Sequence, residues 1–151
     1  GGIDVESHVG AGSRFTVYLP WHGVAARPVA ADEPVAPGNG ETVLLVDDEE
    51  ALVRLGEEQL AELGYEAVGF ASSRAALEAF RAAPDRFQAL LTDEAMPGMT
   101  GSELIAEIRR LRPGLPIVLM SGYVTPALAA RAREAGVAEV LNKPLVARDI
   151  A

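Results

Sequence analysis

Between residues 41 and 143 the chain alternates short apolar runs with longer segments in which apolar residues recur every three to four positions. The first run, TVLLV at residues 42–46, has no polar interruption, which is typical of a strand buried on both faces. The segment that follows, residues 49–64, places Val53 and Leu60 on one side and charged residues on the other. This pattern predicts a helix that ends at its last glycine.

The same alternation recurs four more times along the chain. It predicts strands over residues 65–70, 87–93, 116–120 and 138–142, helices from about residues 73, 101 and 126, and the beginning of a last helix after residue 144. Repeated strand and helix units predict an α/β fold, in which a parallel sheet carries helices on both faces.

The N-terminal part of the chain follows a different pattern. Residues 3–7 and 14–20 alternate apolar and polar side chains around a glycine-rich turn at residues 10–13, which predicts a two-stranded ribbon. Two strands alone are marginally stable in water, so we expect residues 1–20 to be the remnant of a larger domain. Residues 21–40 are rich in Ala, Pro and Gly without periodicity, and we interpret them as a linker to the domain at residues 41–151.

Composition narrows the classes of function. The net charge is −9 and the pI is near 4.7, without any cluster of basic residues, which argues against nucleic-acid binding and against contact with anionic membranes. No apolar run is long enough to span a bilayer and no signal-peptide pattern opens the chain. The chain has no cysteine, so thiolate chemistry is excluded, and we expect a cytoplasmic location.

Polar residues of a consistent kind stand at the ends of the predicted strands. Asp47 and Asp48 follow the first strand of the α/β pattern, Asp93 the third, Ser121 the fourth and Lys143 the fifth. Ligands of open α/β sheets bind beyond the carboxyl ends of the strands, so these side chains are expected to meet there.

A site built from these residues favours phosphoryl chemistry. Each pair of carboxylates about 5 Å apart repels by about 3 kcal/mol at an effective dielectric near 20, and a hard cation such as Mg²⁺ or Mn²⁺ relieves that repulsion. Lys143, the only lysine of the chain, adds a compact positive charge and Ser121 a hydroxyl. Acidic residues after strands are often only helix caps, but the joint occurrence of these aspartates, Ser121 and Lys143 at four strand ends favours a phosphoryl group on a carboxylate.

Four stretches carry a resemblance to a known family: VLLVDDEE, LLTDEAMPGMTG, PIVLMSGY and VLNKPL, in this order. Together they make residues 41–150 similar to a response-regulator receiver domain. The resemblance implies a flavodoxin-like, doubly wound, five-stranded parallel sheet of order 2-1-3-4-5. It also implies that Asp93 accepts a phosphoryl group from a phosphohistidine.

The same resemblance implies a set of roles around Asp93. Mg²⁺ is expected on Asp48, Asp93 and the backbone carbonyl of Ala95, with Asp47 acting through water. Lys143 and Ser121 are expected to contact the phosphoryl oxygens, and a cis peptide between Lys143 and Pro144 to direct the lysine inward; cis bonds before proline are otherwise uncommon.

Two positions near the expected site bear on how the phosphoryl group would be sensed and how long it would last. Val140 stands where the family often has an aromatic switch residue, so movement of the loop around Ser121 is the simpler relay. Tyr123 is an aromatic residue two positions beyond Ser121. It either shields the phosphoryl group from hydrolysis or merely packs on the surface.

Residues 1–20 are similar to the closing strands of a histidine-kinase ATPase domain, through GG, I-x-V-x-S, G-x-G-S and F-x-V-x-L-P. This resemblance implies a hybrid sensor kinase with a receiver domain behind its catalytic domain, although this chain contains no kinase active site of its own. Only LVARDIA follows Pro144, so the last helix is expected to be truncated, leaving apolar sheet surface uncovered.

The expected partner is a histidine kinase or a histidine phosphotransfer domain that serves as phosphodonor, and a homodimer through the fourth helix and fifth strand is also considered. Two alternatives stay open. A phosphatase of the haloacid dehalogenase kind uses a similar set of groups, but it needs D-x-D after its first strand and a cap domain, where this chain has DDEE and no cap. A degenerate receiver that serves only for docking would not need the intact set of polar residues.

Overall fold

The computed structural model describes residues 1–20 and 37–143. The chain divides into two units, Gly1–Glu33 and Pro34–Ala151, and each is described by itself. Most of the expected linker lies outside the described residues, as do the peptide between Lys143 and Pro144 and the expected truncated last helix.

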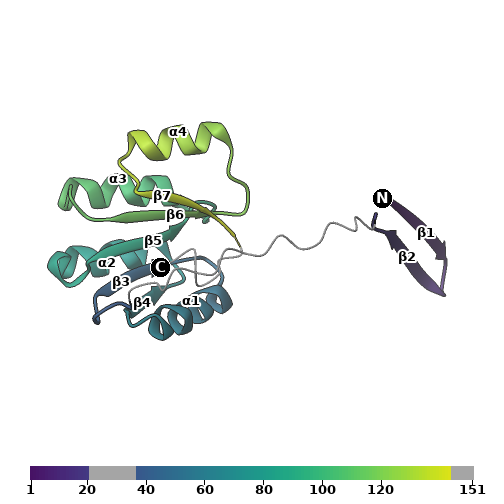
Figure 1. The fold of residues 1–151 in the computed structure, drawn as a ribbon, viewed down its shortest axis with the longest axis horizontal. Helices are drawn as coiled ribbons and strands as arrows, with labels where there is room; N and C mark the ends of the chain where they lie inside the picture. Colours follow the sequence, from purple (N-terminus) through teal and green to yellow (C-terminus); the bar gives the residue numbers. More distant parts are fainter. Residues whose placement is uncertain (21–36, 144–151) are drawn as a thin grey trace. The chain divides into compact units, whose positions relative to one another are not determined.

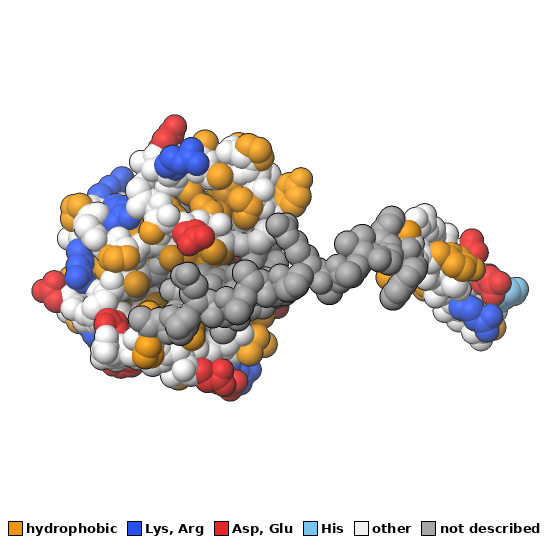
Figure 2. Space-filling view, in the orientation of Figure 1, with side chains coloured by type: hydrophobic (Ala, Val, Ile, Leu, Met, Phe, Trp, Pro, Cys, Tyr) orange, Lys and Arg blue, Asp and Glu red, His pale blue; other side chains and the backbone are white. Residues whose placement is uncertain are grey.

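The first unit contains the predicted ribbon, a hairpin of the antiparallel strands β1 (Gly2–His8) and β2 (Gly12–Tyr18). The turn is shorter than the predicted one at residues 10–13, because Gly12 and Ser13 already pair with His8 and Ser7. Alternation along paired strands places the apolar pairs Ile3–Val17 and Val5–Phe15 on the same face of the hairpin. These side chains are more than half exposed, and Figure 2 shows hydrophobic side chains on the surface of the hairpin.

The second unit is built on a parallel sheet of five strands, in the order β4-β3-β5-β6-β7 (Figure 1). The strands are β3 (Thr42–Val46), β4 (Glu66–Phe70), β5 (Ala89–Asp93), β6 (Ile117–Ser121) and β7 (Glu139–Asn142). Counted from β3, this is the order 2-1-3-4-5 of a flavodoxin-like fold, so the predicted fold class is confirmed.

Helices connect successive strands: α1 (Glu50–Glu62), α2 (Ser73–Ala82), α3 (Gly101–Leu111) and α4 (Pro126–Glu134), with a short 3-10 helix at Pro84–Arg86 that the sequence pattern did not predict. Successive side chains of a strand point to opposite faces of the sheet. Leu44 and Val46 of β3 therefore pack with α2, α3 and α4, whereas Val43 and Leu45 pack with α1. Helices thus lie on both faces, as predicted.

Local sequence explains where the helices begin and end. Thr100 and Glu103 form a capping box at the start of α3, and Ser72 caps α2. Gly64 follows α1 with φ of +89°, a conformation that glycine adopts at little cost, and this fixes the predicted end of the helix. None of the described helices combines the length and the apolar character needed to cross a bilayer.

Candidate functional site

The site lies at the carboxyl end of the sheet, where β3 and β5 run side by side. Val46 pairs with Thr92, so the next residues, Asp47 and Asp93, lie at the same level of the sheet. Both carboxylic residues are buried, with exposed fractions of only 2% and 3%. Two buried carboxylates this close need a counter-charge, because each loses its water and repels the other.

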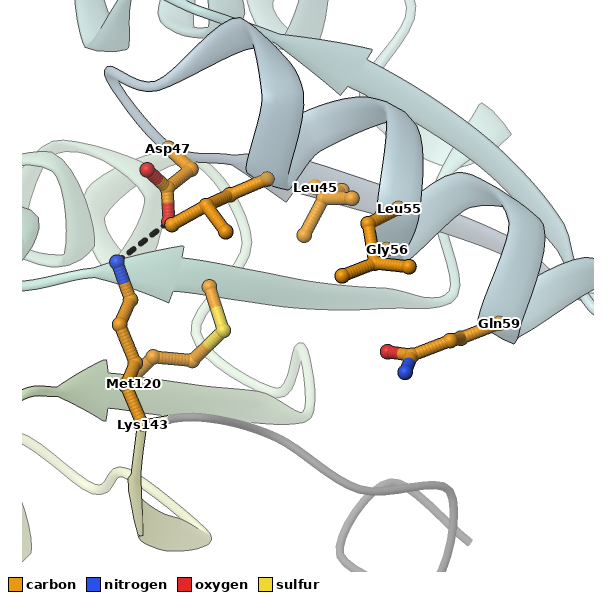
Figure 3. Close-up of a pocket in the computed structure, with 8 residues that line it drawn as sticks. Leu45, Asp47, Leu55, Gly56, Gln59, Met120 and Lys143 are labelled. Carbon is orange, nitrogen blue, oxygen red and sulfur yellow. Dashed lines mark hydrogen bonds and ion pairs between the residues drawn. The ribbon is translucent and has the colours of Figure 1, made fainter.

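Lys143 supplies that charge from the far edge of the sheet. It follows β7, and its long side chain reaches past β6 to place Nζ 2.5 Å from Asp47 Oδ2 and 2.7 Å from Asp93 Oδ1. Figure 3 shows the lysine extending from the end of its strand, beside Met120, to the carboxylate of Asp47. The predicted meeting of residues 47, 93 and 143 is therefore present in the structure.

Opposing effects act on the ammonium group. Burial by itself lowers the pKa of Lys143, but hydrogen bonds and charge interactions with Asp47 and Asp93 outweigh it, so the net pKa is raised above its ordinary value. The group is thus firmly protonated at neutral pH, and it acts as a fixed positive charge between the two carboxylates.

Backbone donors fix the remaining carboxylate oxygens. The amide of Glu49 donates to Asp47 Oδ1 at 3.0 Å, and the amide of Ala95 donates to Asp93 Oδ2 at 2.8 Å. Each carboxylate is therefore held at one oxygen by the turn that follows its strand and at the other by Lys143. The orientation of the Asp93 carboxylate is therefore fixed at both oxygens.

Other predicted site residues lie around this centre without joining the ion pairs. Asp48 is exposed beside Asp47, and Ala95 is exposed beside Asp93. Ser121 is 7% exposed, and its hydroxyl lies 3.2 Å from both the carbonyl and the amide of Tyr123, so it is engaged with the backbone of its own loop.

The two modulating positions occupy different environments. Tyr123 is 80% exposed in the described arrangement. Val140 is partly buried and packs against the core on the side of α2, α3 and α4. Its side chain therefore belongs to the hydrophobic core of the unit.

The predicted cation site depends on how the candidate Mg²⁺ donors lie in the structure. Residues 1–20 and 37–143 contain no group of three or more Asp, Glu or His side chains arranged to hold a metal ion. The candidate donors are nevertheless all oxygens, from Asp47, Asp48, Asp93 and the carbonyl of Ala95, and this donor chemistry fits Mg²⁺. In the described arrangement, Lys143 offsets one of the two negative charges of Asp47 and Asp93, which leaves room for a further cation.

An apolar pocket of about 330 Å³ adjoins the ion pairs, and the sequence pattern did not predict it. Figure 3 shows it between α1 and the ends of the strands, with Asp47 and Lys143 at its polar end. Its other lining residues are Leu45, Leu52, Leu55, Gly56, Gln59 and Met120. Leu52 and Leu55 lie outside the buried stripe of α1, and this surplus of apolar residues was the available signal.

A family model for the response regulator receiver domain matches residues 43–151. The chain belongs to the response-regulator receiver family. Receiver domains accept phosphate from histidine kinases in two-component phosphorelays, so the family match favours the predicted phosphoacceptor over a phosphatase of the haloacid dehalogenase kind.

Similar curated proteins include both sensor kinases and regulators. The sensor histidine kinase AruS of Pseudomonas aeruginosa is 34% identical over 149 residues, covering 96% of this chain and 14% of AruS. The sensor kinase CckA of Brucella abortus is 31% identical over 138 residues, covering 85% of this chain and 15% of CckA. The response regulator FleR of P. aeruginosa is 39% identical over 106 residues, covering 70% of this chain and 22% of FleR. The chain thus spans less than a quarter of each of these relatives.

Solved structures agree with the fold. The chemotaxis protein CheY4 of Vibrio cholerae superposes with a TM-score of 0.69 at 27% identity, over 74% of this chain and 92% of that chain. A CheX–CheY–BeF3–Mg complex from Borrelia burgdorferi superposes with a TM-score of 0.69 at 19% identity, over 73% of this chain and 83% of that chain. The second likeness concerns the fold alone.

Proposed function

We propose that this chain carries the phosphoacceptor of a His-to-Asp phosphorelay and that Asp93 is the residue phosphorylated. The observation that carries the proposal is the buried pair of contacts from Lys143 to Asp93 and Asp47 at the carboxyl edge of the sheet. A buried, oriented carboxylate beside a fixed ammonium is what acceptance of a phosphoryl group requires, since positioning and charge neutralisation supply most of the catalysis.

The transfer forms one bond and breaks another. An oxygen of Asp93 attacks the phosphorus of a phosphohistidine, the P–N bond breaks, and its electron pair stays on the imidazole nitrogen. The product is an aspartyl phosphate. Lys143 already lies 2.7 Å from Asp93 Oδ1, so its charge would lie beside the oxygens of a phosphoryl group bonded to Asp93.

Mg²⁺ would be held by Asp48, Asp93 and the carbonyl of Ala95, with Asp47 acting through water. The ion would neutralise phosphoryl oxygens and the surrounding carboxylates. Support comes from the all-oxygen donor set and from the match to the response regulator receiver domain. Ser121 would offer its hydroxyl to a phosphoryl oxygen after releasing the backbone of Tyr123.

Signal output would begin with this movement of the loop around Ser121. Val140 packs in the core and has no aromatic ring to rotate, which supports a relay through the loop. The exposed Tyr123 would cover the phosphoryl group and slow its hydrolysis. If Tyr123→Ala leaves the lifetime of the aspartyl phosphate unchanged, this role for the ring is wrong.

We place the receiver domain within a hybrid sensor kinase. A match to AruS over 96% of the chain includes most of the N-terminal hairpin, whereas the match to the regulator FleR covers 70%. This difference supports the assignment of residues 1–20 to the end of a kinase ATPase domain and of residues 21–40 to a linker. The phosphodonor would then be a histidine kinase or a histidine phosphotransfer domain.

A homodimer through α4 and β7 remains a further proposal for the same chain. Sedimentation with and without phosphorylation tests it directly. The sedimentation coefficient of a monomer at every protein concentration in both states would reject the dimer.

The deciding experiment is incubation of the chain with acetyl phosphate and Mg²⁺, followed by intact mass. The chain should gain one phosphoryl group, and Asp93→Asn should gain none. Removal of Mg²⁺ by a chelator should abolish the gain in the unmodified chain. An unmodified mass in all samples would instead support a degenerate receiver used only for docking.

A further inference from the structure

Glu94 lies between the proposed phosphoacceptor and Ala95, and its side chain is only 18% exposed. Its carboxylate points to the start of α3, where Oε2 accepts a hydrogen bond from the amide of Ser102 at 2.9 Å and another from its hydroxyl at 2.8 Å. The backbone carbonyl of Glu94 also accepts from the amide of Gly101 at 3.1 Å. Two separate parts of one residue thus hold the first turn of the helix.

These bonds close residues 94–102 into a ring. The backbone of Gly101 lies close to that of Asp93: a Cβ on Gly101 would be only 2.2 Å from the carbonyl oxygen of Asp93. Ala95 lies inside the ring, and its amide donates to the carboxylate of Asp93. The position of Ala95 therefore depends on whether Glu94 keeps the ring closed.

Glu94 lies outside the capping box of α3 and accepts instead from the amides of Gly101 and Ser102. A carboxylate near a helix N-terminus is stabilising in general, through the unpaired amides and the helix dipole. However, α3 already has its capping box, in which Glu103 accepts from the amide of Thr100 at 2.8 Å and the hydroxyl of Thr100 accepts from the amide of Glu103 at 3.2 Å.

The carboxylate of Glu94 also lies near an arginine of α4. Arg131 places a guanidinium nitrogen 3.9 Å from Glu94 Oε1, but the arginine side chain is 67% exposed. Exposed pairs at this distance contribute little. The contacts with Ser102 and Gly101 therefore dominate the environment of Glu94.

We infer that Glu94 is a positioning residue for the phosphoacceptor site: it holds the loop so that the carbonyl of Ala95 and the carboxylate of Asp93 are kept together for the cation. This inference rests on the proposed function. Glu94 itself touches neither the cation nor the phosphoryl group; it acts through its two neighbours in the chain.

The test compares Mg²⁺ dissociation constants, measured by calorimetry on the 151-residue chain without any phosphodonor. Glu94→Ala should weaken Mg²⁺ binding about tenfold, the lower end of the effect usual for residues that support metal ligands. Glu94→Gln should stay within about twofold, because its amide oxygen still accepts from Ser102. Ser102→Ala, which keeps the backbone donor, should lie between the two.

Glu103→Ala is the matched control, since it removes a carboxylate from the same helix end. It should lower the urea midpoint of unfolding but leave the Mg²⁺ constant unchanged. If Glu94→Ala lowers the urea midpoint but leaves the Mg²⁺ dissociation constant unchanged, as the control should, the inference is overturned. Failure of the unmodified chain to bind Mg²⁺ would refute the proposed function and this inference with it, whereas normal binding by every variant refutes this inference alone.

Discussion

Replacing Lys143 with Met removes the charge between two buried carboxylates while keeping much of the side-chain volume. The oxygens of Asp47 and Asp93 that contact its nitrogen lie at most about 5 Å apart, because the two contacts measure 2.5 and 2.7 Å. At an effective dielectric of about 20, this separation corresponds to at least about 3 kcal/mol of repulsion. Since the lysine side chain is 21% exposed and water screens part of the charge, we expect a loss of about 2 to 3 kcal/mol.

Urea unfolding, followed by circular dichroism without Mg²⁺, measures this loss. For a folded unit of this size, the melting temperature should fall by roughly 10 °C. Addition of Mg²⁺ should stabilise Lys143→Met more than the unmodified chain, because the ion takes over the missing positive charge.

A double variant tests the physical cause. Adding Asp47→Asn to Lys143→Met removes one of the two repelling charges, so the double variant should recover about 2 kcal/mol relative to Lys143→Met alone. If the double variant is no more stable than Lys143→Met, or if the single change costs less than about 0.5 kcal/mol, charge repulsion does not govern this edge of the sheet.

Three further predictions concern the same unit. Gly101→Ala should cost about 3 kcal/mol in urea unfolding, because its Cβ would meet the carbonyl of Asp93, whereas Gly114→Ala, with open space around it, should cost little. Arg109→Ala should cost about 2 kcal/mol in urea unfolding, because the guanidinium donates to four backbone carbonyls between residues 113 and 136. An equal loss of stability from Arg109→Lys would show that the planar guanidinium is needed. No loss from either change would contradict a stabilising role for these hydrogen bonds. The raised pKa of Lys143 means that its contribution to stability is complete below the ordinary lysine pKa and is lost as the pH rises through the higher folded value, so pH-dependent unfolding of the unmodified chain and of Lys143→Met should converge only in strongly alkaline solution.

Much of the fold follows from local pattern. The continuous apolar run TVLLV forms the central strand β3, since an uninterrupted run can bury side chains on both faces. Gly64 ends α1 where predicted, because it adopts a positive φ that other residues avoid. The 3-10 helix at Pro84–Arg86 was not predicted, because so short an element has no periodicity to detect.

The site was predictable only in part. That residues 47, 93 and 143 meet follows from a general property of parallel sheets, whose strands end at a common edge. The strand order, however, came from the family resemblance, because periodicity does not specify which strands are neighbours. The ring closed by Glu94 and Ser102 was missed entirely, since an acid and a serine eight residues apart carry no signal until the loop is folded.

By itself, the sequence determined which segments become strands and helices and which polar groups stand at the strand ends, because these depend on hydrophobic periodicity and on residues that begin or end an element. Only the tertiary structure decided how those groups are paired. Lys143 bridges Asp47 and Asp93 while Asp48 stays exposed, and Ser121 turns to the backbone of its own loop. Such choices depend on distances between residues as many as 96 positions apart in the chain, and these exist only once the sheet has formed.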